Sequence, residues 1–71
     1  MLKEITANAI TGRKLVRPVV GEETLVHDGK QIIGRHGPES VTASGNPAIK
    51  ILVGTKLEID DEIKRLGLVA P

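Results

Sequence analysis

The sequence predicts a mainly β protein: a small barrel-like or sandwich-like domain of five or six short strands with a short C-terminal helix. Eight glycines and four prolines divide the 71 residues into short segments, as expected for short strands joined by turns. Several segments are rich in Val, Ile and Thr, which favour strands. The last segment instead places acidic residues, basic residues and a glycine in the order that begins and ends a helix.

The N-terminal segment 1–13 is predicted as an arm outside a single small β-rich domain that spans residues 14–71. Its apolar residues have helical spacing at Leu2, Ile5 and Ala9, but they also alternate from Ile5 to Ala9 as a strand would. Because the two patterns conflict, we expect this arm to be irregular or partly flexible.

Four segments are expected as strands outside the hairpin described next. Lys14–Val20 is β-branched and apolar but contains Pro18, which cannot donate a ladder hydrogen bond, so an edge strand or a bulged strand is predicted. Ser40–Ala43 predicts a weak strand. Ala48–Val53 is the most apolar run and is predicted as the central strand, and residues 57–59 alternate like a brief last strand.

The dipeptide Asp28-Gly29 predicts a β-hairpin with a two-residue type I′ turn, in which both residues take positive φ. Apolar segments flank the dipeptide on both sides. The resulting register pairs Leu25 with Ile32 on one buried face. It leaves His27 beside the turn, pointing outward.

A short helix is predicted over Asp61–Leu66. Asp60 is the expected N-cap, and the acidic residues that follow it suit the positive end of the helix dipole. Gly67 is expected as the left-handed residue that ends the helix, with Leu68 touching Ile63 as in a Schellman motif.

Composition excludes several classes of protein. The chain has no Cys, so a disulfide framework, a thiolate zinc site and a Cys nucleophile are excluded. It also has no Phe, Tyr or Trp, which makes the core thin. A domain near 60 residues buries only about 60% of the surface that its unfolded chain exposes. We therefore expect a protein partner or self-association to contribute to stability.

No constellation of residues predicts catalysis. His27 and His36 lie in or beside expected turns, and no nucleophile motif accompanies them. Together with Glu22, Glu23 and Asp28 they form a formal metal-ligand set, but their spacing places no pair on one ion, and solvated turns are the simpler interpretation. The sequence predicts no enzyme, no cofactor, no metal and no small-molecule substrate.

The charge and the short apolar runs predict a protein that is not located in a membrane. The N-terminus has an acid at Glu4 and no signal-peptide core. No apolar run approaches the about 18 residues of a membrane span. A net charge of +1 attracts neither an anionic membrane nor nucleic acid strongly. We expect the cytoplasm, or a particle assembled there, and no membrane partner.

Four basic residues are candidates for phosphate contact: Arg13, Lys14, Arg17 and Arg35. Cationic side chains along a β-surface are how small barrels follow a nucleic-acid backbone, but such surfaces usually add aromatic rings that stack on bases. Because this chain has no aromatic residue, nucleic acid is an open alternative and not the favoured partner.

The predicted central strand supplies the candidates for self-association: Ile49, Ile51, Leu52 and Val53. Ile49, Ile51 and Val53 alternate onto one face, and Leu52 lies on the other. An ordinary buried strand explains this pattern, and so does a strand that packs against a neighbouring subunit.

The C-terminal run from Gly54 to Val69 (GTKLEIDDEIKRLGLV) resembles the closing segment of many very small tailed-phage and prophage morphogenesis proteins. There a glycine turn, a short strand, an acidic cap, one helical turn and Gly-Leu-Val follow in that order. The resemblance covers about a quarter of the chain and carries no catalytic residues. It implies a non-enzymatic structural or assembly protein of phage or prophage origin, which acts through protein–protein contacts in a virion or during its construction.

Two other functions fit the same sequence. One is a small SH3-like module that binds nucleic acid through its phosphates. The other is a small inhibitor of a host protein.

Overall fold

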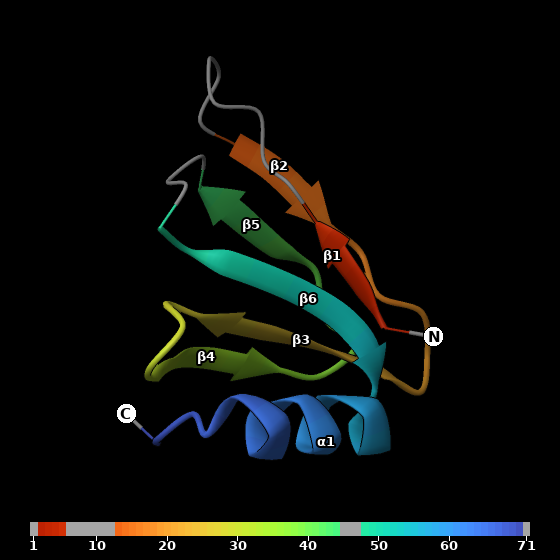
Figure 1. The fold of residues 1–71 in the computed structure, drawn as a ribbon. Helices are drawn as coiled ribbons and strands as arrows, with labels where there is room; N and C mark the ends of the chain where they lie inside the picture. The colour runs from red at the N-terminus through yellow and green to blue at the C-terminus, as the bar shows by residue number, and fades with distance from the viewer. Residues whose placement is uncertain (1, 6–12, 45–47, 71) are drawn as a thin grey trace.

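The fold is mainly β with one short C-terminal helix, which confirms the predicted class (Figure 1). The computed structural model describes residues 2–5, 13–44 and 48–70. Within them lie β1 (Lys3–Ile5), β2 (Arg13–Val16), β3 (Glu22–His27), β4 (Ile32–His36), β5 (Val41–Ser44), β6 (Lys50–Thr55) and α1 (Lys56–Leu66).

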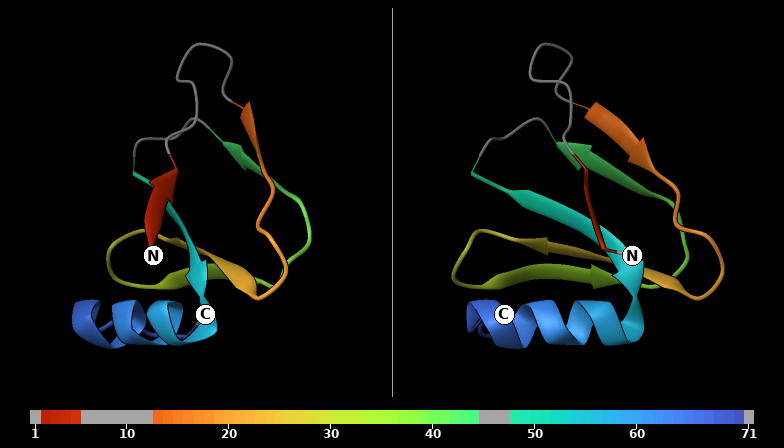
Figure 2. Two further views of the ribbon diagram at one scale, coloured as in Figure 1. Left: turned by 90° about the vertical axis from the view of Figure 1, so that its right-hand side faces the viewer. Right: turned by 45° about the vertical axis from the view of Figure 1, so that its right-hand side comes forward.

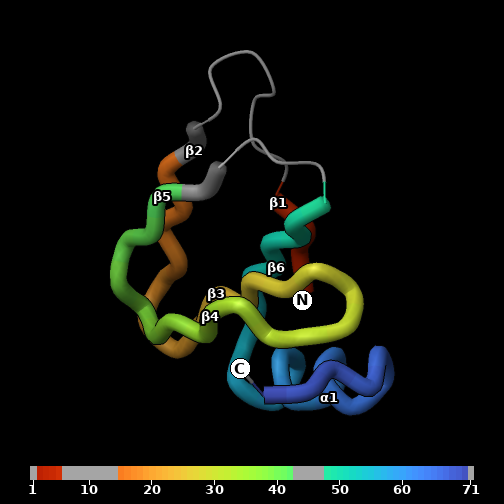
Figure 3. The backbone as a smooth tube through the Cα atoms, turned by 90° about the vertical axis from the view of Figure 1, so that its left-hand side faces the viewer, coloured from red at the N-terminus to blue at the C-terminus, as the bar shows by residue number. Residues whose placement is uncertain are grey.

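The strands form two antiparallel sheets. Four of them pair in the order β1-β6-β3-β4, and β2 pairs with β5. The most apolar run of the sequence is thus in a central strand, β6, as predicted. Viewed from the side, the backbone of the β2-β5 pair lies opposite β6 and does not join the strands of the larger sheet (Figure 3). The two sheets therefore make a small sandwich and not a closed barrel.

Strand β6 is buried on both faces, so it separates two apolar clusters. Ile51 and Val53 pack with Val16 of β2. Leu52, which points the other way, packs with Ile59 of α1. The result is a three-layered arrangement in which the β2-β5 pair covers one face of the larger sheet and α1 covers the other (Figure 2).

The N-terminal part of the chain contributes an edge strand. Lys3 lies opposite Val53 and Ile5 opposite Ile51, which places β1 beside β6. These residues belong to the segment 1–13, for which the sequence analysis expects an irregular or partly flexible arm; instead they form a strand of the larger sheet. Arg13, the last residue of that segment, begins β2. Residues 6–12, which hold most of the alternation from Ile5 to Ala9, lie outside the described residues.

Strand β2 ends at Val16, before Pro18, and its partner is β5. The predicted edge position is confirmed, but the predicted strand Lys14–Val20 is too long, because residues 17–20 lie outside β2.

The β3-β4 turn differs from the predicted type I′ turn. Gly29 has a φ of +91°. Asp28 does not have the positive φ that a type I′ turn requires of it, because no described residue other than glycine has a positive φ. Instead the Asp28 carboxylate oxygen Oδ1 accepts hydrogen bonds from the backbone N–H groups of Lys30, at 2.9 Å, and Gln31, at 2.8 Å. The side chain of the aspartate, which competes with the backbone for these donors, produces a longer turn.

The longer turn changes the hairpin register. Leu25 lies opposite Arg35, with a bulge after Val26, although Leu25 and Ile32 still pack in one cluster as predicted. The prediction for His27 is wrong, since this residue is only 4% exposed. The chain beyond α1 folds back on the same turn, where the Val69 N–H donates to the Lys30 carbonyl and the Ile32 N–H donates to the Val69 carbonyl.

Helix α1 begins earlier than the sequence analysis predicts. Thr55 is the N-cap: its hydroxyl accepts from the Glu58 N–H at 3.3 Å, and the Glu58 carboxylate accepts from the Thr55 N–H at 2.9 Å. This capping box satisfies two backbone donors at once. It overrides the predicted cap at Asp60 and turns residues 57–59 into helix, so the predicted last strand is wrong.

The end of α1 is as predicted. Gly67 is left-handed, with a φ of +66°, a conformation that glycine adopts without a Cβ clash. The Leu68 N–H donates to the Ile63 carbonyl at 3.0 Å, and the Gly67 N–H donates to the Lys64 carbonyl at 3.3 Å. These two bonds define a Schellman motif, and Leu68 packs in the same cluster as Ile63.

Candidate functional site

An exposed apolar surface lies at one end of the four-stranded sheet. Val20 is 94% exposed, Val19 is 65% exposed and Leu57 is 75% exposed. The two valines lie in the turn that enters β3, and Leu57 lies in the first turn of α1. Figures 1 and 2 draw this turn at the same end of the fold as the start of α1. We call Val19, Val20 and Leu57 the apolar end.

Hydrogen bonds fix the turn that presents the two valines. The Glu22 N–H donates to the Val19 carbonyl at 3.0 Å, and the Val19 N–H donates to the Glu22 carboxylate at 3.0 Å. Gly21, with a φ of +93°, supplies the left-handed residue that such a turn requires. Val20 is thereby held at the tip of a closed turn, away from both apolar clusters.

Two charged residues next to the apolar end have no partner among the described residues. Arg17 precedes the turn, and Asp61 follows Leu57 by one helical turn, on the same side of α1. Both residues are exposed, and neither makes an ion pair with any residue that the structure describes. By contrast, the neighbouring Lys56 pairs with Asp60 at 3.3 Å.

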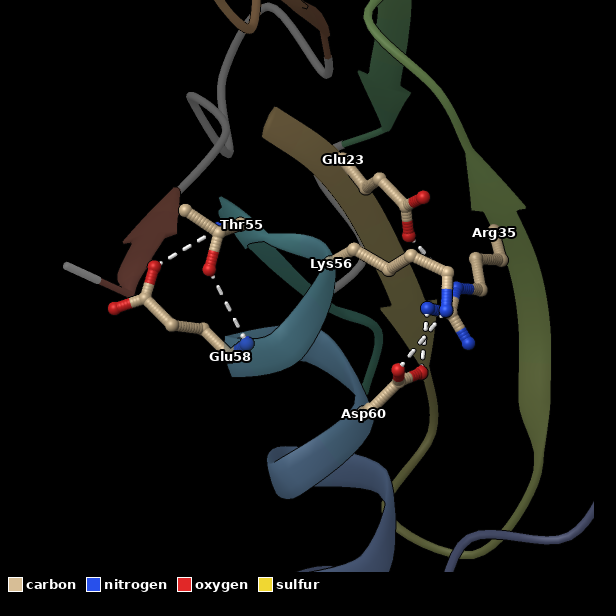
Figure 4. Close-up of polar contacts among 6 residues, drawn as sticks. All are labelled: Glu23, Arg35, Thr55, Lys56, Glu58 and Asp60. Carbon is tan, nitrogen blue, oxygen red and sulfur yellow. Dashed lines mark hydrogen bonds and ion pairs between the residues drawn. The ribbon is translucent and has the colours of Figure 1, made fainter. Parts of the chain in front are cut away.

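A network around Arg35 ties the sheet to α1 (Figure 4). Arg35 Nε donates to Glu23 Oε1 at 2.9 Å, and Arg35 Nη2 donates to Asp60 Oδ1 at 2.6 Å. Hydrogen bonds from Arg35, and then from Lys56, hold the pKa of Asp60 below its usual value. The network joins strands β3 and β4 to the helix, so its role is to hold elements together.

The candidate phosphate-contact residues do not form one stripe. Arg13 and Lys14 lie on β2, and Arg17 follows that strand directly. Arg35 lies on β4, and its side chain reaches α1, on the opposite side of the larger sheet. Its guanidinium is already engaged by two carboxylates, which a phosphate would have to displace.

The candidate self-association residues are packed inside the chain. Ile51, Leu52 and Val53 are buried, and Ile49 is partly buried against the same cluster as Ile51. The chain's own helix and its β2-β5 pair cover these side chains. The burial of Ile51, Leu52 and Val53 fits an ordinary buried strand, whereas Ile49 keeps part of its side chain exposed.

A half-open apolar groove of about 320 Å³ lies between β4 and β5, above β6. Two of its side chains, His36 and Thr42, carry polar groups. The lining residues are Val26, Ile33, Gly34, His36, Val41, Thr42, Ile49 and Ile51.

Signs of catalytic or metal chemistry are sparse among the described residues. No group of three or more His, Asp or Glu side chains there is placed to hold a metal ion. Thr24 and His27 are the buried polar residues of this part of the chain. His27 Nδ1 accepts a hydrogen bond from the Gly29 N–H at 2.9 Å, which gives it a structural role in the turn.

None of the described helical segments is both long and apolar enough to cross a membrane. Comparisons with protein-family models, with curated proteins and with solved structures found no significant match.

The apolar end is the part of the site that the sequence analysis missed. Val19 and Val20 were expected inside a strand, and Leu57 in another. Two signals point to the correct elements: Pro18 ends β2 before the valines, and the Thr55-x-x-Glu58 spacing of a capping box puts Leu57 on a helix.

Proposed function

We propose that this chain is a non-enzymatic structural or assembly protein that acts through protein–protein contacts at the apolar end. The observation that carries the proposal is the exposure of Val20, at 94%, and Leu57, at 75%, at the same end of the sheet. Single exposed apolar residues are ordinary. Three at one end of the fold, with charged residues beside them, are typical of an interaction surface.

The energetics of a small fold support this proposal. Removing an aliphatic side chain from water stabilises a contact by about 1.5 to 3 kcal/mol. A standard interface covers about 800 Å² on each partner, which is about one sixth of this chain's 4731 Å² of accessible surface. One interface of ordinary size would therefore cover a large share of the accessible surface of this chain.

In sequence, the segment from Gly54 to Val69 resembles tailed-phage and prophage morphogenesis proteins, although Gly54 lies in β6 and residues 57–60 lie in α1, so that of the elements in the resemblance the helix and its Gly-Leu-Val ending are present. On this resemblance we place the chain in the assembly of tailed-phage or prophage particles, in the cytoplasm or within the particle. Mass spectrometry of particles and assembly intermediates, purified from a host that carries the coding region, tests this assignment. We expect peptides of the chain in one of these fractions. Their absence from both, while the chain is present in the cell, would contradict it.

Site-specific photo-cross-linking tests the contact surface. A photoreactive residue is placed at position 20, at position 57 or, as a control, at the exposed helical position 64. In cells that make the protein, we expect discrete protein adducts from positions 20 and 57 but not from position 64. Equal adducts from all three positions, or none from 20 and 57, would refute the proposal.

A further inference from the structure

The apolar end is complementary to itself. Resting on the function proposed above, we propose that it binds a second copy of this chain in a symmetric pair, in which Arg17 of each copy faces Asp61 of the other. The partner is identified by charge: the same surface carries one cation and one anion that have no partner among the described residues.

The positions of the two charges fit a two-fold axis. Arg17 directly follows β2 and Asp61 lies on α1, and Figure 2 draws the turn that enters β3 between these two sides. A two-fold axis through the apolar end exchanges these sides, so the apolar residues meet their own copies and each charge meets its opposite. A partner with a single sign of charge would match only one side.

Lys64 also makes no ion pair with the described residues, but it lies one helical turn beyond Asp61 and so further from the apolar end. Other charged residues of the helix already have partners. Arg65 makes a bidentate pair with Glu62, at 2.9 and 2.7 Å, and Lys56 pairs with Asp60. Recruiting them would break an existing ion pair. Arg17 and Asp61 lose nothing of this kind on association, so their pairing adds to the burial of the apolar end.

Sedimentation velocity of the full chain across a concentration series tests the pairing. We expect the wild type to shift from monomer to dimer as concentration rises. The double variant Val20→Lys with Leu57→Lys is expected to remain monomeric, and the matched control Val69→Lys, at another exposed apolar position, to dimerise like the wild type. Circular dichroism verifies that each variant is folded.

Charge exchange makes the test specific. Arg17→Asp alone and Asp61→Arg alone place like charges opposite each other, and we expect each to dimerise about tenfold more weakly than the wild type. In an equimolar mixture of the two variants, both contacts again join opposite charges. The mixture is therefore expected to form a mixed dimer with close to wild-type affinity.

The outcomes separate this inference from the proposed function. A wild type that is monomeric at every concentration, or a mixture that associates no better than either variant alone, overturns the symmetric pair. If position 20 then still cross-links to a different protein, the proposed function stands without self-association. If it cross-links to nothing, both fail.

Discussion

At the scale of single residues, Thr24 carries a polar group that the fold does not satisfy. Its side chain is fully buried, and Oγ1 has no hydrogen-bond partner in the part of the chain that the structure describes. A buried hydroxyl without a partner costs about 1 to 3 kcal/mol. The variant Thr24→Val keeps the β-branched shape and removes the hydroxyl, so we expect the free energy of unfolding to rise by about 1 kcal/mol.

Urea denaturation of wild type and Thr24→Val measures this difference. The matched control is Thr42→Val, at an exposed threonine, which is expected to leave the free energy of unfolding within about 0.5 kcal/mol of the wild type. A Thr24→Val variant that is less stable than the wild type would show that the hydroxyl does have a partner in solution.

Arg35 makes stability depend on pH. Because the Arg35 hydrogen bond lowers the pKa of Asp60, the native state releases this proton more readily than the unfolded state. The stabilisation is therefore complete above the ordinary carboxyl pKa and is lost as the pH falls through and below it, between about pH 5 and pH 2. In Arg35→Met, this part of the acid sensitivity is expected to disappear.

The measurement is the free energy of unfolding at several pH values across this range, for the wild type, Arg35→Met and the control Lys30→Met. We expect the wild type and the control to lose stability in parallel on acidification, and Arg35→Met to lose less. If the free energy of unfolding falls equally with pH in all three proteins, Arg35 does not lower the pKa of Asp60.

At the scale of elements, the capping box decides where α1 begins. Thr55→Ala removes the hydroxyl that accepts from the Glu58 N–H, and we expect it to lower the free energy of unfolding by about 1 kcal/mol. The control Asp61→Ala changes an exposed helical residue outside the box and is expected to have a smaller effect. Thermal unfolding followed by circular dichroism distinguishes the two, and equal effects would contradict the assignment of the cap.

The elements also show what sequence alone can predict. The central strand β6, the edge strand β2 and the Schellman ending at Gly67 were predictable, because apolar runs, a proline and a left-handed glycine act locally. The hairpin turn and the start of α1 were missed because two local signals competed at each. Asp28 accepts hydrogen bonds from the turn backbone, and Thr55 begins the helix before Asp60 does.

The candidate site was less predictable than the fold. Which apolar residues stay exposed depends on which faces the β2-β5 pair and α1 cover, and those contacts join residues distant in sequence. Ile51 and Val20 are both aliphatic and β-branched, yet one is buried in a central strand and the other forms the tip of a turn. Composition and spacing give no means of separating them.

At the scale of the whole molecule, stability depends on two thin clusters that share β6. Leu25 and Ile59, which are fully buried on the helix side, have no aromatic residue to compensate for their loss. Ile59→Ala is expected to cost about 3 kcal/mol, a large part of the about 5 kcal/mol that a domain of this size commonly has.

Urea denaturation and amide hydrogen exchange measure this loss. We expect Ile59→Ala to lose protection in β3 and β6 as well as in α1, since both strands share the cluster. Leu66→Ala, at a partly exposed helical position, serves as the control with a much smaller effect. Loss of protection confined to α1 would show that the helix is an appendage and not a layer of the fold.

The account depends most on the apolar end as the surface through which this molecule makes its contacts. Methyl NMR spectra of the full chain, recorded from dilute to concentrated protein, test it directly. We predict concentration-dependent shifts at the methyl groups of Val19, Val20 and Leu57, and unchanged methyl groups in the groove at Ile33 and Val41. Shifts that centre on the groove would contradict the account, and spectra that do not change with concentration would contradict the symmetric pair.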